Sequence, residues 1–167
     1  MGGSGGGDWK GGRGGSGGTG GGGDTGGAVA SGDSAQNDSK GCGGVMRAAP
    51  VGFLFGGARR FGKDGPAEAF ALSVEIAALT HGHPTGQLPA GVLAAVVHGV
   101  AYEGGTLDEA LDVATDLLRR QPHHEATLAA LAAARRLARE GEPSVARVEA
   151  LGGGWLAEEA LAIAVYA

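Results

Sequence analysis

The residues of this chain with the clearest capacity for chemistry form a short glycine-rich loop. Small and polar side chains over residues 37–44 (NDSKGCGG) lead directly into an apolar stretch that begins at Val45. A glycine-rich loop that runs into a helix N-terminus brings backbone N–H groups close to a ligand and favours anions. The pattern predicts an anion-binding loop, while an ordinary tight turn before a helix stays open as the alternative.

The remaining reactive side chains suggest fewer kinds of site. His81 and His83 could form a metal pair, but no carboxylate or cysteine stands beside them, which favours a polar loop with one ligand-contacting histidine. Cys42 lacks a base spaced to activate it as a nucleophile. We expect Trp155 to anchor the core, and Arg47 to be structural, pairing with an acid or a helix end.

Helical periodicity dominates the part of the chain that must position these residues. Helices are expected after Val45 and over residues 65–79, 89–102, 107–120, 124–140 and 144–151, with a last one from Trp155. Thr106 and Glu109 form a capping-box pattern at the start of one of them. No stretch alternates as a strand would, so the sequence predicts an all-α, compact multi-helix domain with about six helices. The expected buried residues are Leu72, Val74, Ile76, Leu111, Leu117, Leu128, Leu131, Leu161 and Ile163.

Glycine divides the chain of 167 residues into two parts. Of its 36 glycines, 17 fall within residues 1–27, where Met1 and Trp9 are the only large apolar side chains. Such a stretch cannot bury enough surface to offset its ordering entropy. Residues 1–36 are therefore predicted to be a disordered tail or linker, and residues 37–167 a domain. Because the last helix is still periodic at Ala167, we expect this domain to be truncated.

Composition also excludes several classes of protein. Residues 1–27 carry no net charge, so the net charge of −5 comes from residues 28–167 and argues against a nucleic-acid partner, which needs a basic surface. No apolar run reaches the length of about 18 residues that a membrane span needs. A single cysteine excludes a disulfide scaffold and, with no visible export signal, favours the cytoplasm.

Four segments, in this order and spacing, resemble the ADP-ribosylglycohydrolase family, which includes the dinitrogenase reductase-activating glycohydrolases. They are residues 37–50, 79–84, 151–161 and 162–167. The resemblance implies an all-α fold that binds two magnesium ions. It also implies hydrolysis of the glycosidic bond between ADP-ribose and a protein side chain or a related acceptor, so the expected partner is ADP-ribose or an ADP-ribosylated protein.

The resemblance assigns ADP-ribose contacts to the glycine-rich loop and to the histidine after Leu79-Thr80. The substrate-binding residues that it implies are Ser39, Gly41, Cys42, Gly43, Gly44, Val45, Met46 and His81. Many members of the family carry asparagine where this chain has Cys42, so one amide hydrogen-bonding group is lost.

The resemblance leaves the metal ligands and the catalytic residues unassigned. The family's magnesium ligands lie in a Thr-Asp-Asp type motif upstream of the loop and an Asp-x-Asp-Thr type motif downstream of the last helix. Neither motif occurs in this sequence, although magnesium needs several converging carboxylate oxygens. Two hypotheses follow. The chain is a hydrolase whose acids come from sequence outside it, or it is a non-catalytic remnant that at most binds ADP-ribose.

Overall fold

The computed structural model describes residues 34–55 and 65–167, and these residues fold as helices without a strand. The prediction of an all-α fold is confirmed. Residues 1–33 of the expected tail lie outside the described residues. The elements are η1, a 3-10 turn (Val45–Arg47), and the helices α1 (Ala49–Leu54), α2 (Gly65–Ala78), α3 (Pro84–Tyr102), α4 (Leu107–Arg119), α5 (Glu125–Arg139), α6 (Val145–Glu149) and α7 (Ala157–Tyr166).

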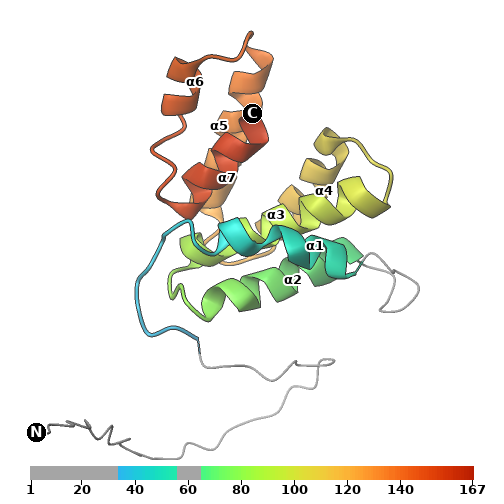
Figure 1. The fold of residues 1–167 in the computed structure, drawn as a ribbon, viewed down its shortest axis with the longest axis vertical. Coiled ribbons are helices and arrows are strands. Elements are labelled where there is room, and N and C mark those ends of the chain that lie inside the picture. Colours follow the sequence, from blue (N-terminus) through green and yellow to red (C-terminus); the bar gives the residue numbers. More distant parts are fainter. Residues whose placement is uncertain (1–33, 56–64) are drawn as a thin grey trace, which may run out of the picture.

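Helix α3 is the centre of the fold, and α1, α2, α4 and α7 all pack against it (Figure 1). Three of its residues, Ala90, Val92 and Ala94, have no exposed surface. Helices α5 and α7 lie side by side as a second group. The main apolar cluster joins the two groups, because it includes Val92 of α3 together with Leu131 of α5 and Leu161 of α7.

Helix α3 begins earlier than the sequence suggested. We expected its first residue to be Pro89, but that proline lies inside a helix that starts at Pro84. The His83 ring caps this start, since its Nδ1 accepts from the Thr85 N–H at 3.0 Å. Proline suits the first position of a helix because its missing N–H would be unpaired there. The earlier proline and its cap therefore set the boundary, and Pro89 is tolerated in the second turn.

Of the nine apolar residues that were predicted to be buried, three are fully buried. Leu111, Leu131 and Leu161 are buried, with exposed fractions of 1–2%. The other six are half-buried and lie at the edges of apolar clusters: Leu72, Val74, Ile76, Leu117, Leu128 and Ile163. Small residues take the deepest positions instead, because alanines on α2, α3 and α4 allow the helices to approach closely.

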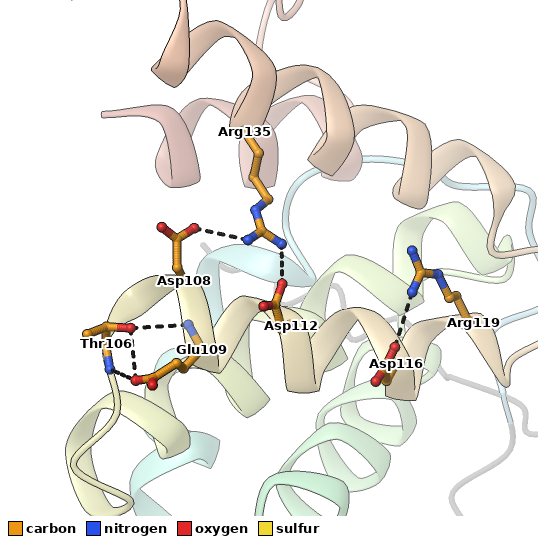
Figure 2. Close-up of polar contacts among 7 residues, drawn as sticks. All are labelled: Thr106, Asp108, Glu109, Asp112, Asp116, Arg119 and Arg135. Carbon is orange, nitrogen blue, oxygen red and sulfur yellow. Dashed lines mark hydrogen bonds and ion pairs between the residues drawn. The ribbon is translucent and has the colours of Figure 1, made fainter.

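Two sets of polar contacts fix α4 (Figure 2). The expected capping box is formed, with the Thr106 hydroxyl accepting from the Glu109 N–H at 3.3 Å and the Glu109 carboxylate accepting from the Thr106 N–H at 2.8 Å. Farther along, Arg135 of α5 donates to Asp112 at 2.5 Å and to Asp108 at 3.0 Å. The cap thus sets where α4 begins, and the arginine sets its separation from α5.

Replacing Glu109 by Gln should destabilise the fold in a pH-dependent manner. Hydrogen bonds from the Thr106 backbone and hydroxyl lower the pKa of Glu109 below its ordinary value of 4.5. A carboxylate whose pKa is lowered on folding stabilises the folded state above its unfolded pKa, and this contribution is lost as the pH falls through the folded pKa. The urea midpoint of Glu109→Gln should therefore fall below that of wild type at neutral pH, and the two should converge below pH 4.5.

The control variant is Glu142→Gln, at an exposed glutamate that has no hydrogen bond or ion pair to any described residue. Its urea midpoint should match wild type throughout. An effect of Glu109→Gln that is equal at all pH values would show that the carboxylate charge does not contribute to the cap.

Candidate functional site

The glycine-rich loop is fastened at its beginning by the side chain of Asn37. Its Oδ1 accepts from the backbone N–H groups of Ser39, at 3.0 Å, and Gly82, at 2.9 Å. Its Nδ2 donates to the Thr80 carbonyl at 3.1 Å. One amide therefore ties the start of the loop to the turn between α2 and α3, more than forty residues later.

The middle of the loop is fastened to the residues that precede α7. The Cys42 N–H donates to the Trp155 carbonyl at 2.9 Å, and the Ala157 N–H donates to the Lys40 carbonyl, also at 2.9 Å. These bonds form an isolated antiparallel bridge between Gly41 and Leu156. The loop thus runs between the α2–α3 turn and the start of α7 (blue in Figure 1).

His81 packs directly against the loop. A Cβ built on Gly43 would lie 3.4 Å from Cε1 and 3.5 Å from Nε2 of the His81 ring, and one on Gly41 would lie 3.7 Å from Nε2. The ring is buried, with 8% of the residue exposed. The two parts of the sequence that the resemblance had linked to one ligand are therefore neighbours on one side of the domain.

Three consecutive backbone N–H groups of the loop lack an acceptor. None of the described residues accepts a hydrogen bond from the N–H of Gly43, Gly44 or Val45. Gly44 and Val45 are buried, and a buried N–H without a partner is costly. Successive free N–H groups in a turn form a concave donor site for anions.

The element that follows the loop differs from the expectation drawn from the sequence. We expected the loop to run into a helix N-terminus, whose dipole would favour an anion. It runs instead into η1, of three residues, and α1, of six, which are too short to supply much of a dipole. The individual N–H groups of the loop are the donors that an anion would meet.

The side chains of the loop make their described contacts within the loop and with the core. Ser39 is half-buried, and its hydroxyl accepts from the Gly41 N–H at 3.4 Å. The half-buried Cys42 places its thiol 3.6 Å from the Met46 sulfur. Met46 is 76% exposed, whereas Val45 is buried in the main core and anchors the turn.

The expectation that Trp155 anchors the core is wrong. Its residue is 82% exposed, because its carbonyl is held by the loop while the indole projects away from the core. Met46 of the loop is also a largely exposed apolar residue. Periodicity could not have revealed the exposure of Trp155, since Trp155 precedes α7 and belongs to no helix face.

Arg47 and Thr80 form a contact that sequence reasoning also missed. We expected Arg47 to be structural and to pair with an acid or a helix end. Its guanidinium donates to the hydroxyl of Thr80, in the turn that follows the end of α2, and not to an acid. That hydroxyl is 2.8 Å from Nδ1 of His81. The arginine therefore reaches the histidine through the threonine, and neither sequence spacing nor charge pattern signals such a contact.

Glu158, in the first turn of α7, is a carboxylate whose surroundings shift its pKa. Burial raises its pKa, and the neighbouring Glu159 adds to this shift. The backbone N–H of Glu158 itself, and after it Lys40 and His83, oppose the shift. Its Oε2 is buried and has no hydrogen-bond partner in the described structure. Glu159 is already engaged, because it accepts from the Leu156 N–H at the start of α7.

The described residues do not fit the two magnesium ions that the family resemblance implies. Across residues 34–55 and 65–167, no group of three or more histidine, cysteine, aspartate or glutamate side chains lies close enough to hold a metal ion. His83 uses its Nδ1 to cap α3, so that this nitrogen is engaged by the Thr85 N–H. Magnesium requires several converging oxygen ligands, and those near the loop do not converge.

A cavity lies away from the loop, between α4 and α5. It has a volume of about 620 Å³, and its lining includes Arg119, Arg136 and Leu128. Its arginines are mostly neutralised, since Arg119 pairs with Asp116 and Arg136 with Glu140. No residue of the loop lines this cavity.

Comparison with known proteins identifies the family of the chain. The family model for ADP-ribosylglycohydrolase matches residues 8–167, and the chain belongs to this family of hydrolases. The match begins within the glycine-rich segment. No curated protein and no solved structure matches the chain. Among the described helices, none is both long and apolar enough to cross a membrane.

Replacing Gly86 by Ala should disrupt the loop, because a Cβ there would lie 2.6 Å from the Ser39 carbonyl oxygen and 3.0 Å from the His81 Cβ. Overpacking of this kind costs about 1–3 kcal/mol, which thermal unfolding can measure. In the control variant Gly105→Ala, the new Cβ would meet only Glu109, at 3.5 Å or more. Equal unfolding temperatures for the two variants would contradict the close backbone packing described here.

Proposed function

We propose that this chain binds the ADP-ribose group of ADP-ribosylated proteins, or of a related acceptor, at the loop Ser39–Met46 and His81. The observation that carries the proposal is the row of unpaired N–H groups at Gly43, Gly44 and Val45. ADP-ribose contains a pyrophosphate with two negative charges, and charge-assisted hydrogen bonds from backbone N–H groups are strong. Membership of the family supports this ligand over other anions.

Each part of the loop has a function in this proposal. The N–H groups of Gly43, Gly44 and Val45 donate to phosphate oxygens, and His81 supplies a side-chain donor beside them. The exposed side chains of Trp155 and Met46 each offer an apolar surface on which a base or a ribose can pack. Ser39 and Cys42 shape the loop between these contacts.

The same proposal separates binding from hydrolysis. Binding through backbone N–H groups requires no metal, whereas cleavage of the glycosidic bond requires an activated water and a stabilised leaving group. The described acids near the loop do not form a group that could hold a metal. We therefore propose that the 167-residue chain, by itself, binds its ligand without appreciable turnover.

A second candidate function is that of an ADP-ribose-binding module with no hydrolytic role. The lack of a metal-binding group in the described structure favours it. The two candidates share one binding site and differ in the source of the catalytic acids. In-frame acidic motifs in the flanking gene sequence would favour the hydrolase, and their absence would favour the binding module.

The binding test is a calorimetric titration with ADP-ribose. Wild type should bind, and His81→Ala should bind at least about tenfold more weakly, as expected for loss of a hydrogen bond to a charged group. His123→Ala is the control, since this exposed histidine lies on the turn between α4 and α5 and should bind like wild type. Absence of binding by folded wild type would refute the proposal.

The turnover test uses release of ADP-ribose from a protein carrying ADP-ribosyl-arginine, with magnesium added. We expect negligible release by the isolated chain because no described group of side chains can hold the metal. A full-length member of the family serves as the positive control. Magnesium-dependent release at a comparable rate would show that other residues of this chain form the metal site.

A further inference from the structure

The Thr80 hydroxyl is the link between an exposed arginine and the buried histidine of the site. Arg47 of η1 donates to Thr80 Oγ1 from one side. His81 Nδ1 lies 2.8 Å from the same oxygen on the other side. The Gln87 side chain donates to the His81 carbonyl at 2.6 Å and fixes the backbone of the histidine. The ring therefore meets the hydroxyl in a defined orientation.

The Thr80 hydroxyl can donate its one hydrogen either to the His81 ring or to another acceptor. A threonine hydroxyl has one hydrogen, and a guanidinium can only donate. The Arg47 contact therefore uses a lone pair of Oγ1 and leaves the hydrogen for one of two acceptors. These are the Ala77 carbonyl, at 3.4 Å, and His81 Nδ1, at 2.8 Å. In the alternative arrangement, a protonated Nδ1 would donate to the second lone pair of Oγ1 and the hydroxyl would donate to the Ala77 carbonyl. A separation of 3.4 Å is long for an O–H···O bond, so the contacts favour donation from the hydroxyl to Nδ1.

We propose that Arg47 and Thr80 are positioning residues that keep the ring proton of His81 on Nε2, the nitrogen that faces Gly41 and Gly43. The assignment of the proton follows from the contacts at Nδ1, because a neutral imidazole carries its proton on one nitrogen only. That the Nε2 proton is donated to ADP-ribose rests on the proposed function. In the other tautomer, Nε2 would present a lone pair to the oxygens of an anionic ligand.

The tautomer is tested first, without ligand, in the full chain carrying ¹⁵N-labelled histidine. Ring nitrogen shifts and couplings distinguish a protonated Nε2 from a protonated Nδ1. Wild type and Thr80→Ser should show the proton on Nε2, because both retain the hydroxyl. Thr80→Val removes the hydroxyl at an exposed residue of nearly equal shape, and its His81 signals should move toward a mixture of tautomers. Arg47→Met should move them in the same direction.

Affinity for ADP-ribose is tested next on the same variants. Thr80→Val should bind about tenfold more weakly than wild type, the cost of losing one hydrogen bond to a charged ligand, and Thr80→Ser should bind within about twofold. Thr127→Val is the matched control, since Thr127 is a fully buried threonine of α5 whose hydroxyl has no partner in the described structure.

The outcomes separate this inference from the proposed function. A proton on Nδ1 in wild type, or identical ring signals in wild type and Thr80→Val, would overturn the positioning role whether or not ADP-ribose binds. Binding that Thr80→Val and Thr80→Ser weaken equally would also overturn it, since a merely structural effect would not be rescued by serine. If wild type binds no ADP-ribose, the proposed function fails, and the donation to ligand fails with it.

Discussion

Direct packing of backbone on backbone between the loop and the α2–α3 turn is the constraint on which the site depends. A Cβ on Gly82 would lie 1.8 Å from the Asn37 carbonyl oxygen, and one on Gly44 would lie 2.8 Å from the Gly86 carbonyl oxygen. Side chains at these positions would force the two segments apart. Because they are absent, Asn37 can bridge the segments and His81 can lie against the loop.

This packing explains why some backbone N–H groups of the loop have no hydrogen-bond acceptor, although the segments on either side of them are hydrogen-bonded. The residues before the donors are held by Asn37 and by the segment that precedes α7, and those after them by η1 and the core contact of Val45. With both flanks fixed, the N–H groups of Gly43 and Gly44 cannot rotate toward acceptors of their own. A preorganised donor site of this kind lowers the entropy cost of binding an anion. It is also independent of any metal, and therefore of the acidic groups that hydrolysis requires.

The sequence predicted the fold better than it predicted the details of the site. Helical periodicity and the Thr106–Glu109 cap depend on neighbours a few residues apart, so they can be recognised in the sequence and were found in the structure. The exposure of Trp155 and the partner of Arg47 were not foreseen, because the surroundings of both residues come from segments distant in sequence. The glycines of the loop were recognised by type, but which N–H groups stay unpaired depends on tertiary contacts. The boundary at Pro84 was missed because a histidine provides the cap.

The most direct measurement of the central claim is an amide NMR titration of the ¹⁵N-labelled chain with ADP-ribose. The account predicts that the largest shifts occur at the amides of Gly43, Gly44 and Val45, with further changes at His81. Adenosine, which lacks the pyrophosphate, should leave those three amides nearly unmoved. Shifts centred on the cavity between α4 and α5, at Arg119 and Leu128, with the loop amides unchanged, would contradict it.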